Sequence, residues 1–167
     1  GKPQLISPAA QAIYALDPMS GKELWVARYP SHSTGSRPLY AHGLIYVSTG
    51  FGKADLYAIK PDGKGDVTDT HVAWKATKGI GSKPSPLVVD DLIYSLGDGG
   101  SLTCLDAKTG AEVWQGRVGK NFAASPLYAD GLIWCFAEDG GATLVQPGRE
   151  FKEAGKVKLD SGGRTMG

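Results

Sequence analysis

Short apolar segments alternate with polar turns along most of the chain. The stretch from Pro84 to Val118 shows the pattern most clearly, with the segments Leu87–Val89, Leu92–Leu96, Leu102–Leu105 and Glu112–Val118. Short runs bounded by Gly, Asp and Pro are typical of antiparallel strands joined by tight turns. The stretch therefore predicts a four-stranded meander. Since one such sheet cannot cover both of its apolar faces, it needs neighbours on both sides.

The same unit recurs before and after this stretch. A Pro-Leu pair opens each copy at Pro38, Pro86 and Pro126, so the copies lie 48 and 40 residues apart. Each pair is followed by a turn and by a second apolar segment that begins Leu-Ile, at Leu44, Leu92 and Leu132. A period of about 40–50 residues with four strands in each period is typical of β-propeller blades.

The repeat predicts an all-β chain that forms one partial β-propeller domain, residues 1–167, of four-stranded antiparallel blades. The expected blades are approximately residues 1–29, 37–78, 84–118 and 125–159. The first of them lacks its innermost strand, which gives about three and three-quarter blades and fifteen strands. The fourth lacks a tryptophan on its outermost strand, where Val157 is expected instead.

A propeller needs at least about four blades, so this chain is expected to depend on further structure. Either the missing blades of a longer chain or self-association of two half rings would complete the ring. The tail after residue 159 is a further candidate for the missing inner strand. Open terminal blades would expose strand edges, so a monomer is the least expected state.

A second motif marks the outer half of the blades. It occurs at Ala15, Asp17, Gly21 and Trp25, and again with the same spacing at Cys104, Asp106, Thr109, Gly110 and Trp114, while Trp74 occupies the last position in the second blade. This pattern resembles the tryptophan-docking repeat of PQQ-like (quinoprotein alcohol dehydrogenase-like) β-propellers. The chain departs from the family pattern once in each copy, with Ser20 in place of Thr and Cys104 in place of Ala. The resemblance covers nearly the whole chain and is strongest to bacterial repeat proteins related to the outer-membrane assembly lipoprotein propeller.

The resemblance implies a structural role for the motif and two alternative functions for the protein. In that family the Asp-x-x-Thr-Gly turn joins the two outer strands, and the Trp packs between blades. The first function is a non-catalytic binding or assembly scaffold in the bacterial envelope, exported to the periplasm, with other envelope proteins as partners. The alternative is part of a PQQ-dependent alcohol or sugar dehydrogenase.

Ligands of propellers usually lie over the central channel, near the linkers and the starts of the inner strands. By alignment the candidates here are Arg37, Lys83, Ser85, Asn121 and Ser125, with Phe122 nearby. A quinone carboxylate would suit Arg37. PQQ also requires stacking surfaces and a Ca²⁺ beside a catalytic Asp, and the sequence offers no such set. It also lacks the adjacent Cys-Cys pair found in many PQQ alcohol dehydrogenases. No catalytic residue and no cofactor are therefore predicted, and PQQ with Ca²⁺ is the alternative.

The second blade has a long loop, residues 60–70, in place of the short motif turn. Its acidic residues Asp62, Asp66 and Asp69 offer oxygen ligands of the kind that Ca²⁺ prefers. No Glu closes the loop in the manner of an EF-hand, so a solvated hairpin loop is the preferred interpretation. No metal site is predicted.

Charge and cysteine content narrow the function further. Eighteen basic and 17 acidic residues give a net charge of +1, which does not favour nucleic acid as a partner. No apolar run approaches the roughly 20 residues of a membrane span. Cys104 and Cys135 are expected to be small buried side chains, with a disulfide between blades as the alternative.

Overall fold

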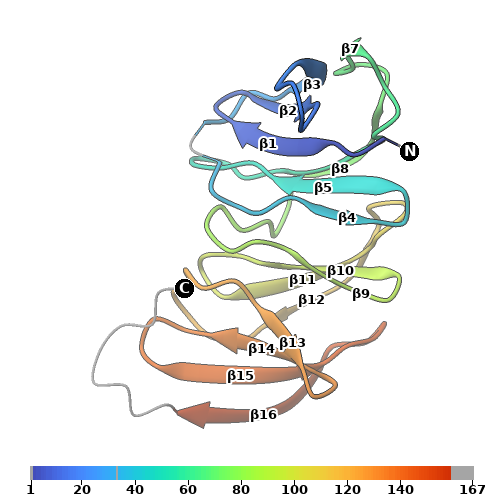
Figure 1. Ribbon diagram of the computed structural model, residues 1–167. Helices are drawn as coiled ribbons and strands as arrows, with labels where there is room; N and C mark the ends of the chain where they lie inside the picture. Colours follow the sequence, from blue (N-terminus) through green and yellow to red (C-terminus); the bar gives the residue numbers. More distant parts are fainter. Residues whose placement is uncertain (1, 33, 159–167) are drawn as a thin grey trace.

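The computed structural model describes residues 2–32 and 34–158 and contains four β-sheets of four strands each. The sheets stack one after the other along the chain, and no helix occurs among the described residues (Figure 1). The predicted all-β propeller architecture of four-stranded blades is confirmed. The described part of the chain also contains no helix long and apolar enough to cross a membrane.

Three of the sheets are sequential antiparallel meanders. The second blade contains β4 (Leu39–Ala41), β5 (Leu44–Ser48), β6 (Leu56–Ile59) and β8 (Val72–Ala76). The third contains β9 (Leu87–Val89), β10 (Leu92–Leu96), β11 (Ser101–Asp106) and β12 (Glu112–Arg117). The fourth contains β13 (Leu127–Ala129), β14 (Leu132–Phe136), β15 (Gly141–Gln146) and β16 (Lys152–Lys158). Two-residue turns with a left-handed first residue, such as His42-Gly43 and Asp130-Gly131, join the first two strands.

The first blade is built differently. Its strands β1 (Leu5–Ala9), β2 (Ala12–Leu16) and β3 (Glu23–Arg28) form the expected three-stranded meander without an inner strand. The fourth strand of the sheet is β7 (Gly65–Asp66), which comes from the long loop of the second blade and pairs with β3 in parallel. The described chain thus has sixteen strands, and the expectation of fifteen is wrong. The tail proposed as an inner strand lies outside the described residues.

One apolar side chain explains why this loop crosses to the first blade. Val67, directly after β7, is 1% exposed and packs in one cluster with Trp25 and Tyr29. Its N–H donates to the Val26 carbonyl at 2.8 Å. The loop is therefore an outer strand of the neighbouring blade and differs from the solvated hairpin that the sequence predicted.

Every blade carries a register shift between its last two antiparallel strands. The shift follows Ala15, Ala58 and Cys104 in the first three blades, and their cross-strand partners are Trp25, Trp74 and Trp114. In the fourth blade the shift follows Leu144, whose partner is Gly155. The tryptophan position is thus occupied by Gly155, and the expectation that Val157 occupies it is wrong. A bulge places two residues of one strand opposite one residue of its partner, and the sequence alone does not show where this happens.

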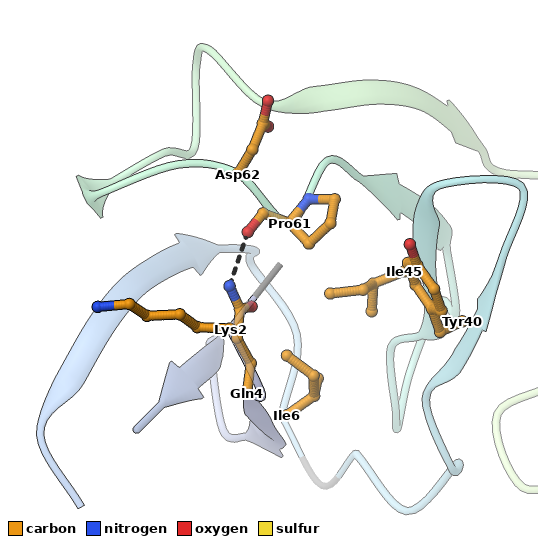
Figure 2. Close-up of a pocket in the computed structure, with 7 residues that line it drawn as sticks. All are labelled: Lys2, Gln4, Ile6, Tyr40, Ile45, Pro61 and Asp62. Carbon is orange, nitrogen blue, oxygen red and sulfur yellow. Dashed lines mark hydrogen bonds between the residues drawn. The ribbon is translucent and has the colours of Figure 1, made fainter. Parts of the chain in front are cut away.

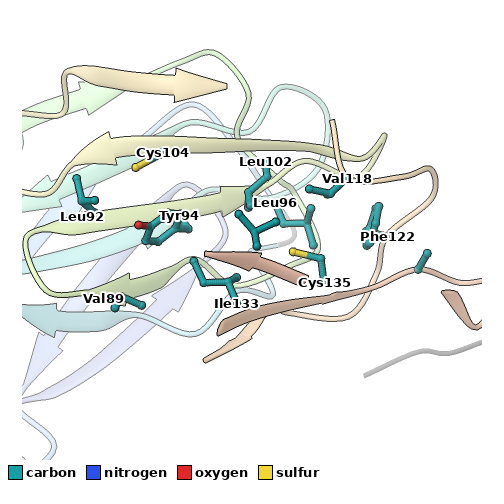
Figure 3. Packing of buried hydrophobic residues seen from close by; sticks show 12 residues of the cluster. Val89, Leu92, Tyr94, Leu96, Leu102, Cys104, Val118, Phe122, Ile133 and Cys135 are labelled. Atoms are coloured by element: carbon teal, nitrogen blue, oxygen red, sulfur yellow. The ribbon is translucent and has the colours of Figure 1, made fainter. Parts of the chain in front are cut away.

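The core consists of clusters that lie between successive blades. Figure 3 shows the cluster between the third and fourth blades, where Tyr94, Leu102 and Ile133 are fully buried. Cys104 and Cys135 belong to the same cluster, and both are free thiols. Burial raises the pKa of Cys104 to about 11 and that of Cys135 to about 12. The two cysteines act here as small apolar side chains.

We expect neither thiol to react in the native protein. At pH 8 a pKa of about 11 leaves on the order of 0.1% of Cys104 as thiolate, and the buried sulfur is inaccessible to a reagent. Titration with a chromogenic disulfide should detect no thiol before denaturant is added and two afterwards. Rapid reaction of one equivalent in native buffer would contradict the packing of this cluster.

Candidate functional site

A ladder of hydrogen bonds joins the blades at the linker end of the inner strands. The N–H of Arg37 donates to Ser85 Oγ at 2.9 Å, and the N–H of Ser85 donates to Ser125 Oγ at 2.9 Å. These three residues occupy the same place in successive blades, directly before the Pro that opens each unit. The structure thus brings three of the five channel candidates together. Both serine hydroxyls serve as acceptors for the preceding blade.

The other channel candidates lie in the linkers. The N–H of Lys83 donates to the carboxylate of Asp98 at 3.2 Å, and Ser82 donates to the same carboxylate through both its N–H and its hydroxyl. The Asn121 carbonyl accepts from the N–H of Glu138 at 2.9 Å. These contacts hold the linkers against the hairpins between the second and third strands of the blades.

The residues present at this end do not fit a bound quinone. Phe122, the aromatic residue of the linker before the fourth blade, is 1% exposed within the core, and the exposed Phe51 lies beside His32, with 5.9 Å between the ring centroids. Ser85 and Ser125 use their hydroxyls between blades, and the Asp98 carboxylate is already hydrogen-bonded by Ser82 and Lys83. The arrangement is suited to joining blades.

The joint between the second and third blades shows how a tryptophan docks. The ring of Trp74 lies over Gly110, where a Cβ would come within 2.5 Å of the ring. Its Nε1–H donates to the Ala107 carbonyl at 3.1 Å, and the Tyr46 hydroxyl donates to the same oxygen at 2.9 Å. Gly110 also has a φ of +72°, so the turn needs glycine for its backbone and for the space beside it.

The joint between the third and fourth blades replaces the glycine turn with other groups. Trp114 donates through Nε1 to the Gly148 carbonyl at 2.8 Å, and its ring centroid lies 5.3 Å from that of Phe151 and 5.8 Å from that of Tyr94. Arg149 reaches back across this joint to Asp91 at 2.9 Å and to Asp106 at 3.1 Å. Sequence analysis missed both Arg149 and Phe151. Their only signal was the altered turn at Pro147–Ala154.

The joint between the first and second blades uses a relay. Trp25 is fully buried, and its Nε1–H donates to Gln4 Oε1 at 3.2 Å. The amide nitrogen of Gln4 donates in turn to the Pro61 carbonyl of the second blade at 2.9 Å. By register, Pro61 corresponds to Ala107. Gln4 thus extends Trp25 to the carbonyl that the other tryptophans reach directly or within one residue. A single glutamine outside the motif carries no sequence signal of this role.

The carboxylates of Asp17 and Asp106 stabilise the outer turns of the first and third blades. Asp17 Oδ1 accepts from the N–H groups of Met19 and Ser20, both at 2.9 Å, and Asp106 Oδ1 accepts from Thr109 at 2.9 Å and 3.0 Å. Hydrogen bonds from Ser20 and Met19 lower the pKa of Asp17, and those from Thr109 and Arg149 lower the pKa of Asp106. Both turns are therefore formed in the same way, although Ser20 stands in for Thr in the first.

The terminal blades are unequal in their docking groups. The first blade has a complete motif turn, and a Cβ at Gly21, where φ is +69°, would meet nothing within 4 Å. A docked indole is therefore not present on this turn within the described chain. The fourth blade has Gly155 at the tryptophan position, and a Cβ there would likewise meet nothing within 4 Å. One end can accept an indole, and the other has none to offer.

The three acids of the long loop do not converge on one point. Asp66 pairs with Arg28 of the first blade at 3.2 Å and accepts from Thr68, whose hydrogen bonds lower its pKa. Asp62 lies 3.7 Å from Nε2 of His71. Asp69 is exposed. In the described ranges no group of three or more His, Cys, Asp or Glu side chains is placed to hold a metal ion.

Comparison with known proteins finds similarity to outer-membrane assembly-factor propellers. A family model described as outer membrane protein assembly factor BamB matches residues 65–147. The outer membrane protein assembly factor BamB of Burkholderia pseudomallei is 34% identical over 83 residues, which are 48% of this chain and 22% of that protein. The crystal structure of BamB from Moraxella catarrhalis has a TM-score of 0.75 at 18% identity, over 96% of this chain and 51% of that one.

These findings confirm the predicted relationship: the chain is a PQQ-like β-propeller related to BamB. The likeness to the Moraxella structure establishes the fold, since the identity there is low. This chain spans about half of that structure and a smaller share of the Burkholderia relative.

We expect alanine at Gly110 to destabilise the protein more than alanine at Gly21. Both glycines have a left-handed backbone, so each substitution costs about 1–2 kcal/mol for that conformation. At Gly110 the methyl group also overlaps Trp74, which adds about 1–3 kcal/mol of overpacking. Urea unfolding of the two variants measures the difference. Repeating the pair with Trp74→Leu should shrink it, and equal costs for the two glycines would refute the docking contact.

Proposed function

We propose that the chain acts as a non-catalytic scaffold in the assembly of proteins at the bacterial outer membrane. The observation that carries this proposal is the resemblance to assembly factor BamB. It is seen in the family model, in the sequence of the Burkholderia protein and in the fold of the Moraxella protein. By the same relationship the protein works in the periplasm with other envelope proteins as partners. It presents surface to those partners and carries out no reaction on them.

The distribution of polar contacts supports a scaffold. The tryptophans, the motif carboxylates and the inner serines all bond to neighbouring repeats or to their own turns. Groups that a dehydrogenase would use at the channel serve here to hold blades together. The quinoprotein alternative is therefore not favoured.

We further propose that additional blades of a longer chain, rather than a second copy of this one, complete the ring. Ring closure by two copies would place the fourth blade of one copy against the Gly21 turn of the other. Gly155 supplies no indole for that turn, so this joint would lack the contact that the internal joints have. The size of the Moraxella relative is consistent with such blades.

The assembly role predicts a defect in the outer membrane of the host bacterium. Deleting the gene should lower the amount of β-barrel proteins in the outer-membrane fraction, and a plasmid copy should restore it. Quinone-dependent oxidation of alcohols and sugars by the periplasmic fraction should stay unchanged. An unchanged membrane together with a loss of that oxidation would overturn the proposal in favour of the dehydrogenase.

The asymmetry of the terminal blades predicts the behaviour of the isolated chain. Light scattering should find no discrete particle of twice the monomer mass. Gly155→Trp provides the missing indole, so this variant should shift toward such a dimer, because a buried aromatic ring is a strong anchor at an interface. The substitution Glu112→Trp, at an exposed residue of the third blade, serves as the control. A stable dimer of the unmodified chain would refute the role assigned to Gly155.

A further inference from the structure

Two cavities adjoin on the side of the second blade. The first, about 610 Å³, is lined by Lys2, Gln4, Ile6, Tyr40, Ile45, Pro61 and Asp62. The second, about 520 Å³, is lined by His42, Gly43, Leu44, Lys60, Pro61, Asp62, Ala73 and Lys108. They share Pro61 and Asp62, so an extended segment of a few residues can enter both.

The first cavity is mainly apolar. Figure 2 shows Ile6, Ile45 and Tyr40 facing one another below Pro61, while the Gln4–Pro61 hydrogen bond crosses between the blades. Tyr40 is 70% exposed, which is unusual for a large aromatic side chain. The space accepts an apolar side chain, and Tyr40 can cover it from the solvent side.

The second cavity has more cations than acids among its lining residues. Lys60 and Lys108 are exposed, and within the described residues neither forms an ion pair; the same holds for Lys2 of the first cavity. The one acid of both linings is Asp62, whose Oδ1 lies 3.7 Å from Nε2 of His71.

The joint between the third and fourth blades shows what can bind at the position of the second cavity. By strand register, Gly43 and Lys60 correspond to Asp91 and Asp106 of the third blade. There the two acids bind Arg149, a cation from the fourth blade. The second blade therefore has a cation where the third has an acid. A group that pairs with this cation as Arg149 pairs with the two acids would be an acid from outside the described chain.

We propose that the two cavities bind an acidic peptide segment of a partner protein, with an apolar side chain in the first cavity and carboxylates at Lys60 and Lys108. A phosphate group fits less well, because the cations are flexible lysines without an arginine fork and Asp62 stands among them. The identification of the occupant as a protein rests on the proposed scaffold function. The positive charge and the two cavities are features of the structure and do not depend on that function.

Fluorescence anisotropy with two synthetic peptides tests the site. The labelled probe has one Phe and four Asp or Glu residues, made in both sequence orders, and its counterpart has four Lys residues in place of the acids. The acidic probe should bind and should weaken as salt rises, because exposed charges are screened. The lysine peptide should not bind. Equal binding of both peptides, or of neither, would overturn the proposal.

Substitutions then locate the site. Lys60→Glu with Lys108→Glu should weaken binding of the acidic probe by about tenfold or more, since each change removes an attraction and adds a repulsion. Lys22→Glu with Lys152→Glu changes the net charge equally on exposed residues elsewhere and should leave binding within about twofold. Tyr40→Ser should weaken the probe with Phe and leave a Phe→Gly probe unaffected. Equal effects of the two charge pairs would show nonspecific attraction and refute the site.

Further outcomes distinguish the peptide site from an ordinary anion site and from the proposed scaffold function. Complete displacement of the probe by millimolar inorganic phosphate would show an ordinary anion site and overturn the peptide assignment. If the probe binds as described and gene deletion leaves the outer membrane unchanged, the scaffold function fails and the site stands. If deletion has its effect and no probe binds, the function stands and the site fails.

Discussion

The docking of a tryptophan on the outer turn of the next blade is the constraint on which the structure depends. A four-stranded sheet has two apolar faces and cannot be stable without cover on both. Trp74 covers part of one face and reaches a specific carbonyl of the next blade, so it fixes the distance and the angle between two sheets at once. Because every blade contacts only its neighbours, the stability of the whole is close to a sum of such joints.

The three joints reach the same result with different residues. Trp74 packs on a glycine, Trp114 packs against Phe151, and Trp25 acts through Gln4. What they share is an indole N–H that ends, directly or through one amide, on a carbonyl at the start of the outer turn of the next blade. The geometry of the donor and the volume of the ring are therefore what the fold requires. The partner that fills the remaining space can vary, which is why the repeat is visible in some blades and altered in others.

This tolerance explains how far the sequence could predict the structure. Local signals determined many strands: Leu87–Val89 and Leu92–Leu96 have the bounds that alternation and turn residues predict. β7 was not predictable, because two residues pair with a strand some 40 positions away and the only apolar marker is Val67. The docking position in the fourth blade was misplaced by two residues, since without a tryptophan or the motif turn the sequence has no marker for it. The inner serines were located by alignment, but their role in joining blades depends on the arrangement of the blades in space.

The two ends of the blades consequently differ in what they leave free. At the linker end the serine hydroxyls and the Asp98 carboxylate are engaged by neighbouring backbone groups, so this end is largely committed to holding the ring. At the opposite end the outer turns differ from blade to blade, and their charges are matched at one joint and unmatched at another. Arg149 forms ion pairs with Asp91 and Asp106, while Lys60 and Lys108 line one cavity in which Asp62 is the one acid. A scaffold built from repeats can differ only where the repeat is not needed for packing. The unmatched outer turns are therefore where this chain has room to distinguish one partner from another.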